Sequence, residues 1–130
     1  MRQADTHVAI WLALDETKIS KRARAAITAA RQGGEPLAIS GISLWEIALA
    51  EAKGRISLKS SLETFLASLE ERFTVLPLTG RICALTRRLP AAYPRDPADR
   101  IIAATALDQG LALITADREI HRSKALRAIW

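Results

Sequence analysis

The sequence predicts an α/β protein, a three-layer α/β/α sandwich with a mostly parallel central sheet. Short apolar runs alternate along the 130 residues with longer segments of helical periodicity. The apolar runs are continuous rather than alternating with polar residues, which is typical of strands covered on both faces. No repeat, low-complexity tract or Pro/Gly-rich linker divides the chain, so we expect a single domain over residues 1–130.

The first half of the chain predicts helices around one clear strand. Arg2-Gln3-Ala4 occupies the place of a first strand, although it is short and polar where a buried strand is usually apolar. The elements expected after it are a helix over Thr6–Leu14, a helix from Ser20 to about Arg31 that Gly33-Gly34 ends, a buried strand over Leu37–Ser40, and a helix from about Leu44 to Lys53 that stops at Gly54.

The second half repeats the alternation of helix and strand. A helix capped by Ser60 reaches about Arg72, and its apolar residues fall on one face. The elements expected after it are a strand over Thr74–Leu78, a helix over Gly80–Leu89, a loop over Pro94–Pro97, a helix that Asp96-Pro97 opens and Gly110 closes, a strand over Leu111–Thr115, and a last strand over Leu126–Trp130.

Composition excludes several classes of protein. A hydrophobic fraction of 49% is too high for a disordered chain, and no apolar run approaches the roughly 20 residues of a membrane-spanning helix. The charged N-terminus does not suit a secretory signal, and the single Cys83 excludes an intrachain disulfide, so we expect a cytoplasmic protein. Lys and Arg total 19 against 14 acidic residues, a balance that favours the capture of polyanions.

Acidic residues follow the predicted strands or begin the helices after them. Asp5, Glu46, Asp99 and Asp117 occupy such positions, and in a parallel sheet they can meet at one edge. Converging carboxylates repel one another unless a cation neutralises them, and hard oxygen ligands suit Mg²⁺ or Mn²⁺. Because the chain has no His or Cys cluster, zinc is a poor candidate.

Each acid also fits a purely structural role. Ser43-Leu44-Trp45-Glu46 reads as a capping box, and Asp96 is a good N-cap before Pro97. Asp99 lies in a first helical turn, where acids are favoured, while Asp5 and Asp117 suit a cap or a turn. Taken one at a time, the structural roles are favoured over catalysis, and only the joint pattern indicates a site.

The remaining polar and aromatic residues favour structural interpretations. His7 is expected to pack in a first helical turn, and His121 is expected to be solvated in a polar stretch. Trp11, Trp45 and Trp130 are spaced as core residues rather than as a platform for base stacking, and Cys83 is expected to be a small core residue.

Motifs along the whole chain resemble the PIN domains of the VapC group. They keep the order and spacing of that family from one end of the chain to the other. The matching stretches are Asp5-Thr6-His7-Val8 with Trp11, Ile39 to Ala48, Lys53-Gly54-Arg55, Val75-Leu76-Pro77-Leu78, Arg95-Asp96-Pro97-Ala98-Asp99-Arg100, Ala103-Ala104-Thr105-Ala106 and Leu113-Ile114-Thr115-Ala116-Asp117.

The resemblance implies an endoribonuclease with an acidic Mg²⁺ site, in which Mn²⁺ can replace Mg²⁺, acting as the toxin of a toxin–antitoxin pair. It also implies an RNA substrate, a small cognate antitoxin protein and a homodimer. Residue by residue, the family's acidic positions fall on Asp5, Glu46, Asp99 and Asp117, with Asp5, Asp99 and Asp117 as metal ligands. Thr115 and, less closely, Thr6 match hydroxyl positions beside that site, whereas Asp96 is additional and fits an N-cap.

Two arginines flank the acidic loop. Arg95 and Arg100 are candidates for holding the RNA backbone, and they are equally candidates for salt bridges with Asp96 and Asp99.

Other functions stay open at this point. One is a catalytically silent PIN-like domain that binds nucleic acid or a protein partner; a nuclease assay with and without Mn²⁺ separates it from the enzyme. Other Mg²⁺ proteins with similar sheets fit poorly. A haloacid-type phosphatase needs a second Asp where His7 stands, and a receiver domain needs a Lys soon after Thr115.

Overall fold

A computed structural model of residues 1–130 contains one sheet of five short strands, all parallel, in the order β3-β2-β1-β4-β5. Helices follow the strands along the chain, as the alternation of apolar runs and helical patterns predicted. The strands are β1 (Arg2–Ala4), β2 (Leu37–Ser40), β3 (Thr74–Leu76), β4 (Ala112–Ile114) and β5 (Ala128–Ile129).

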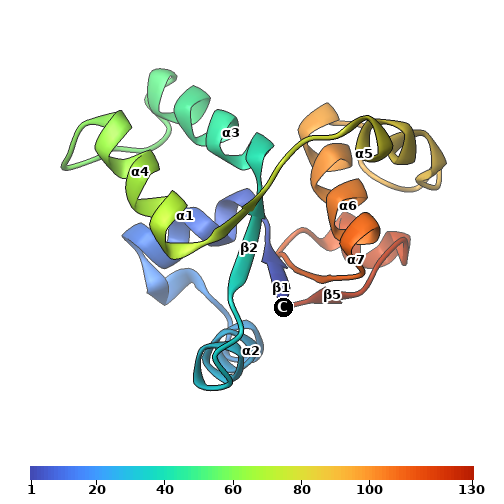
Figure 1. The fold of residues 1–130 in the computed structure, drawn as a ribbon, viewed down its shortest axis with the longest axis horizontal. Coiled ribbons are helices and arrows are strands. Elements are labelled where there is room, and N and C mark those ends of the chain that lie inside the picture. Colours follow the sequence, from blue (N-terminus) through green and yellow to red (C-terminus); the bar gives the residue numbers. More distant parts are fainter.

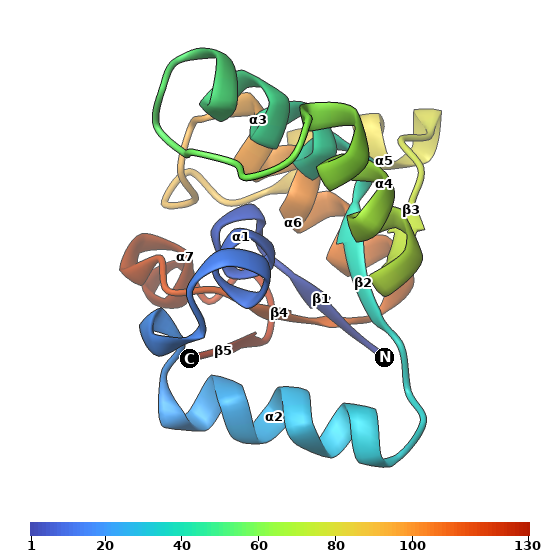
Figure 2. The same cartoon turned by 90° about the vertical axis from the view of Figure 1, so that its left-hand side faces the viewer.

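Helices cover both faces of this sheet. In Figure 1, α1, α3 and α4 lie on one side of β1 and β2, and α5, α6 and α7 lie on the other. Figure 2 shows α2 beneath the strands, near both termini. The helices are α1 (Thr6–Leu14), α2 (Lys21–Gln32), α3 (Gly41–Ala52), α4 (Leu62–Arg72), α5 (Gly80–Leu85), α6 (Pro97–Gln109) and α7 (Arg118–Ser123), with 3-10 turns η1 (Glu16–Lys18) and η2 (Thr86–Arg88). The fold is the expected α/β/α sandwich. None of its helices combines the length and apolar character needed to cross a membrane.

Side chains of the central strands supply a separate hydrophobic cluster on each face. Successive side chains of a strand point to opposite faces, so Ile114 packs in the larger cluster with residues of α1, α2 and α4, whereas Leu113 packs with Ile102 and Ile120 on the other face. Burial on both sides explains why the strands read as continuous apolar runs.

The polar first strand lies at the centre of the sheet. β1 pairs with β2 on one side and with β4 on the other. Gln3 is fully buried there, and its Nε2 donates a hydrogen bond of 3.0 Å to the carbonyl oxygen of Ile102 in α6. The side-chain amide is therefore partly satisfied by a helix that the sequence places 99 residues away.

The strand order reverses direction at β1. From β1 the chain builds β2 and then β3 toward one edge, while β4 and β5 are added on the other side of β1. At such a reversal the connections leave the sheet on opposite faces, which opens a crevice beyond the carboxyl ends of β1 and β4. Asp5 follows β1 directly, and Thr115 follows β4 directly.

Two helix starts and two short elements differ from expectation. α3 begins at Gly41 rather than near Leu44, because the Oγ of Ser40 accepts a hydrogen bond of 3.2 Å from the backbone N–H of Ile42. Ser61 rather than Ser60 caps α4. The sequence patterns did not indicate η1 and α7, each shorter than two helical turns.

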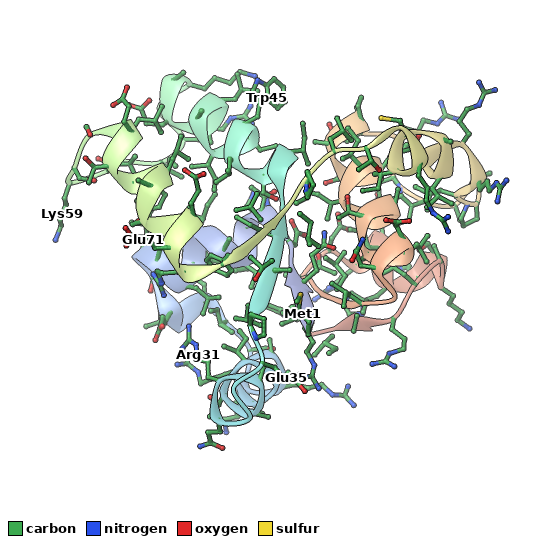
Figure 3. All side chains as sticks on the ribbon, viewed as in Figure 1. Met1, Arg31, Glu35, Trp45, Lys59 and Glu71 are labelled. Atoms are coloured by element: carbon green, nitrogen blue, oxygen red, sulfur yellow. The ribbon has the colours of Figure 1, made fainter.

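Two residues expected in the core lie outside it. Trp45 is 56% exposed at the outer surface of α3 (Figure 3), because Ser43 and Ile47, on the opposite side of that helix, are the residues that face inward. Cys83 is exposed because Ile82 is the residue of α5 that faces the core. Both helices bury a narrower stripe than their apolar content suggests.

Candidate metal centre

Acidic residues from four parts of the chain meet at the carboxyl ends of β1 and β4. A cavity of about 280 Å³ lies there, lined by Asp5, His7, Trp11, Asp99, Ala116 and Asp117. Glu46 of α3 and Asp96, the N-cap of α6, lie beside Asp99, and one carboxylate oxygen from each of these three residues lies within 4.8 Å of the others. We call Asp5, Asp99 and Asp117 the inner group, and Glu46, Asp96 and Asp99 the outer group; Asp99 belongs to both.

Asp5 is held by a contact across the sheet. Its Oδ2 accepts a hydrogen bond of 2.6 Å from the hydroxyl of Thr115, and the residue is only 7% exposed. The same Thr115 hydroxyl accepts a hydrogen bond of 3.1 Å from the backbone N–H of Asp117. Asp5 precedes α1 but makes no side-chain capping bond. Asp5 thus occupies the N-cap position, but its side chain does not cap the helix, and its carboxylate contacts Thr115 after β4 instead.

Asp117 caps α7 and also faces the cavity. Its Oδ1 accepts hydrogen bonds from the backbone N–H groups of Glu119 (2.9 Å) and Ile120 (3.4 Å). Its Oδ2 accepts none within the protein, so the residue can cap the helix with one oxygen and offer the other to a ligand. The capping interpretation is confirmed, and it is compatible with a site.

Glu46 is not part of a capping box. It lies more than a turn inside α3, where its Oε1 accepts a hydrogen bond of 2.6 Å from the hydroxyl of Thr6. The Thr6 hydroxyl also lies 2.8 Å from the Oγ of Ser43, which is buried. Thr6 thus connects the start of α1 to the side of α3 that carries Glu46.

Asp96 has the capping role expected of it. Its Oδ2 accepts a hydrogen bond of 3.0 Å from the backbone N–H of Asp99, and Pro97 begins the helix. The carboxylate is exposed, in contrast to the half-buried Glu46 and Asp99. The cap nevertheless places it within reach of a cation shared with those two residues.

Burial and mutual repulsion make this edge costly to keep charged. Burial, and after it the negative charges of Asp96, Asp5, Glu46 and Asp117, together raise the pKa of Asp99 to about 7. Burial also raises the pKa of Glu46, against the opposing effect of its hydrogen bond from Thr6. The pKa of Tyr93 is raised by burial and then by the charge of Asp99, whose carbonyl oxygen accepts a hydrogen bond from the Tyr93 hydroxyl.

None of these carboxylates forms a salt bridge with a Lys, Arg or His side chain. Arg100 is half-buried and donates instead to the carbonyl oxygens of Thr86 (3.3 Å) and Tyr93 (3.4 Å), so of its two candidate roles the ion pair with Asp96 or Asp99 is wrong. Arg95 is exposed and also unpaired. The donors offered at this edge are hard oxygens, which fit Mg²⁺ or Mn²⁺ and do not favour zinc.

Sequence reasoning missed one residue that lines the cavity, Trp11, and one residue beside it, His121. The Nε2 of His121 lies 2.8 Å from the carbonyl oxygen of Thr115, so this half-buried histidine is not the solvated residue expected. Trp11 lines the acidic cavity together with His7, which is exposed. Each lies four residues after a residue that does line the cavity, His121 after Asp117 and Trp11 after His7, and that helical spacing is the signal that could have found them.

An oxygen-rich edge of this kind can hold one or two divalent cations. Such cations polarise a phosphoryl or carbonyl oxygen and lower the pKa of bound water, which is the chemistry of hydrolysis. The excess of basic residues elsewhere in the chain favours a polyanionic substrate.

Comparisons with known proteins assign this arrangement to a family. The family model described as the PIN domain matches residues 4–126. Ribonuclease VapC22 of Mycobacterium tuberculosis is 34% identical over 128 residues, which are 97% of this chain and 95% of that protein.

Solved structures show the same fold at lower identity. The VapBC2 complex of Rickettsia felis, bound to a DNA fragment from its promoter, contains a chain with a TM-score of 0.72 at 15% identity, covering 98% of this chain and 96% of that one. The DNA-bound VapBC of Salmonella typhimurium gives a TM-score of 0.67 at 24% identity, covering 98% and 97%.

Proposed function

The chain belongs to the PIN-domain family as a VapC-type ribonuclease toxin of a toxin–antitoxin system, and on that premise we propose that Asp5, Asp99 and Asp117 hold the divalent metal ion needed to cleave RNA. One observation carries this proposal. Five carboxylates gather at one edge of the sheet without a single basic partner, in a chain that has 19 Lys and Arg residues. Such a cluster is stable at neutral pH only with protons or a cation to neutralise it.

The protein side chains would divide the work of hydrolysis among them. Bound Mg²⁺ or Mn²⁺ would supply Lewis-acid stabilisation of the phosphodiester and a lowered pKa for the attacking water. Asp5 and Asp117 are each held by hydrogen bonds and would offer their remaining oxygens to the cavity that they line. Glu46, which accepts a hydrogen bond from Thr6 and lies next to Asp99, would accept the proton of the water that attacks phosphorus as one P–O ester bond breaks.

The first experiment tests the dependence on metal. Purified protein should cleave single-stranded RNA with Mg²⁺ or Mn²⁺ and stop in EDTA, because the repelling carboxylates cannot accommodate another anion without a cation. Isothermal titration with Mn²⁺ should show binding by the wild type and by Asp108→Asn, and much weaker binding by Asp99→Asn. Asp108 is the matched control, since it lies in the same helix but pairs with Arg81 at 2.6 Å. Full cleavage in EDTA would exclude this site.

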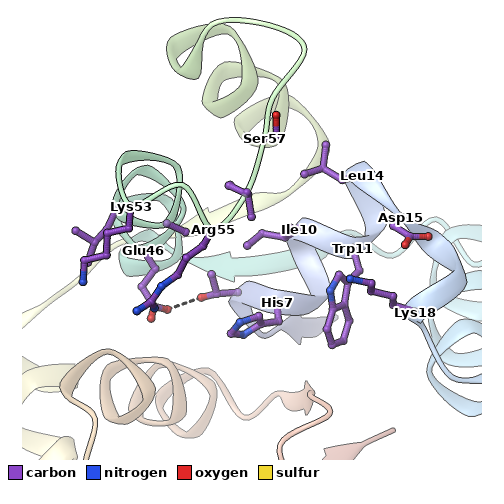
Figure 4. A pocket seen from close by; sticks show the side chains of 14 residues that line it. His7, Ile10, Trp11, Leu14, Asp15, Lys18, Glu46, Lys53, Arg55 and Ser57 are labelled. Atoms are coloured by element: carbon purple, nitrogen blue, oxygen red, sulfur yellow. Dashed lines mark hydrogen bonds between the residues drawn. The ribbon is translucent and has the colours of Figure 1, made fainter.

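The structure also offers a surface for the antitoxin. A pocket of about 450 Å³ between α1 and α3 is lined by apolar residues that include Ile10, Leu14, Leu49 and Ile56 (Figure 4). An apolar face of a partner helix suits such a groove. We therefore propose that the cognate antitoxin covers this pocket, next to Glu46.

Leu14 provides a test of that surface. It is 44% exposed and lines the pocket, whereas Leu107, 43% exposed, lies on α6 outside it. Leu14→Glu should leave toxicity on expression intact. Rescue by the co-expressed antitoxin should be weaker, so that at least about tenfold more antitoxin inducer is needed, because a buried charge opposes docking. Leu107→Glu should be rescued like the wild type. Equal rescue of both variants would place the antitoxin elsewhere.

A further inference from the structure

Two aromatic side chains form a wall of the acidic cavity. His7 and Trp11 lie one helical turn apart on α1, with ring centroids 6.0 Å apart and ring planes inclined by 48°. Both line the same cavity as Asp5, Asp99 and Asp117. In Figure 4 their rings point to the same side of α1. A ligand that enters this cavity therefore meets carboxylates and aromatic rings together.

The indole of Trp11 is supported from behind. Trp130, the last residue of the chain, packs against it: the ring centroids of Trp11 and Trp130 are 5.7 Å apart, and the two ring planes are inclined by 50°. Trp11 is half-buried and packs at the border of the main hydrophobic cluster, so its position is fixed while part of its surface stays accessible to the cavity. A rigid, partly exposed aromatic ring costs little conformational entropy when a ligand packs on it.

The chemistry of the cavity selects a neutral, planar group for this wall. A phosphate beside three carboxylates needs a cation, but the base of an adjacent nucleotide carries no charge and offers a π-face to an aromatic ring. The bases of a duplex are already stacked on one another, so only an unpaired base can reach such a ring.

Basic residues continue from this wall. Lys18, Lys53 and Arg55 line the adjoining pocket, whose lining also includes His7 and Trp11, and none of the three forms a salt bridge. Figure 4 shows Lys18 beside Trp11. Unpaired cations on either side of an aromatic surface match the phosphates on either side of a nucleotide base.

We propose that Trp11, flanked by His7 and backed by Trp130, is a stacking platform for an unpaired RNA base next to the phosphate held at the carboxylates. The proposal rests on the proposed function and adds a determinant of substrate choice to it: the enzyme selects single-stranded RNA through this ring. Trp11 acts in binding and not in bond breaking.

Binding of a fluorescein-labelled octauridylate in Ca²⁺, followed by fluorescence anisotropy at low salt, tests the platform, because Ca²⁺ also takes oxygen ligands and can neutralise the carboxylates beside the phosphate. Gel electrophoresis checks that the RNA stays intact during the measurement. Trp11→Leu keeps apolar volume but removes the aromatic face, and should bind about 5- to 150-fold more weakly, the effect expected for the loss of one stacked base. Trp11→Phe should stay within about threefold of the wild type. Trp45→Leu, which removes an exposed tryptophan outside both cavities, should bind like the wild type.

An abasic ribose-phosphate chain of the same length separates stacking from a structural effect. The wild type should bind it more weakly than octauridylate, and Trp11→Leu should cause no further loss, because the base that stacks is missing. Three outcomes would each overturn the platform. They are equal affinity of the wild type and Trp11→Leu for octauridylate, a drop in affinity on Trp11→Leu that is as large for the abasic chain as for octauridylate, and no binding of octauridylate by the wild type. Failure of the proposed function is seen separately, as absence of RNA cleavage by the wild type in Mn²⁺.

Discussion

The inner and outer groups share Asp99 but are held in different ways. In the inner group, Asp5 and Asp117 lie just beyond the ends of paired strands, and each accepts a hydrogen bond from a fixed donor, the hydroxyl of Thr115 or the first N–H groups of α7. In the outer group, Glu46 projects from the middle of α3, and Asp96 is an exposed cap. The inner group is anchored to the sheet, and the outer group depends on how two helices pack.

This difference shows why a carboxylate's donors matter as much as its neighbours. Hydrogen bonds to the charged form of an acid favour that form, whereas burial without enough donors favours the protonated form. Asp99 accepts no side-chain or backbone hydrogen bond at its carboxylate, and its pKa is raised to about 7. Of the acids in the two groups, Asp99 is therefore the one whose charged form is stabilised most when a cation binds.

The largest effects are expected when Asp99, the acid shared by the two groups, or Asp5, an acid anchored to the sheet, is neutralised. Asp99→Asn and Asp5→Asn should each reduce the initial rate of RNA cleavage in Mn²⁺ by on the order of 10²–10³ or more, because oxygens that stabilise transition-state charge are lost. Asp96→Asn should stay within about tenfold, since Asn also caps a helix. Circular dichroism checks the fold of each variant. A loss for Asp96→Asn as large as that for Asp5→Asn would make the outer group the principal ligand set.

A substitution at Thr115 tests the inner group alone, because Thr115 contacts acids of that group and none of the outer group. Thr115→Val removes the hydroxyl that binds Asp5 and Asp117 while keeping the shape of the side chain, and should lower activity or Mn²⁺ affinity about 10- to 100-fold. Thr105→Val is the matched control: it is also buried, but its hydroxyl donates only to the carbonyl of Ile101 in its own helix. Similar activity of the two variants would mean that Asp5 needs no such support.

The smallest expected effect is on stability without metal. The raised pKa of Asp99 keeps its proton on the folded protein up to about pH 7, whereas in the unfolded chain the carboxyl loses that proton near its ordinary pKa of 3.8. The folded state therefore binds more protons between these pH values, so the metal-free protein should lose stability as pH rises from about 4 to 7. Asp99→Asn should remove that loss and be more stable than wild type at pH 7.5 in EDTA by about 1–3 kcal/mol, allowing for partial solvent screening.

Urea unfolding of both proteins in EDTA at pH 5 and pH 7.5 measures this difference. The wild type should gain stability relative to Asp99→Asn on going to pH 5, where Asp99 is protonated in the folded protein. An identical pH dependence of the two proteins would show that Asp99 titrates normally. Addition of Mg²⁺ at pH 7.5 should raise the melting temperature of the wild type more than that of the variant.

Much of the fold could be read from local patterns. The helices of Thr6–Leu14 and Pro97–Gln109 were predicted because each carries its own signals, a continuous run of mostly apolar residues in the first and Asp96, Pro97 and Gly110 at the ends of the second. The burial of Trp45 and Cys83 was predicted wrongly because an apolar side chain does not reveal which stripe of its helix a neighbour will cover. That choice belongs to packing.

The parallel α/β architecture and the positions at which acids follow strands could be predicted from local patterns, because hydrophobic periodicity and the residues that begin and end helices are local properties of a chain. The partner that each acid contacts depends instead on how distant parts of the chain pack. Thr115 reaches Asp5 across 110 residues, Thr6 reaches Glu46 across 40, and Gln3 is buried against α6. Hydrogen bonds between such distant residues form only once β1 lies between β2 and β4, so capping and catalysis, which share the same residue types, become distinguishable only in the folded protein.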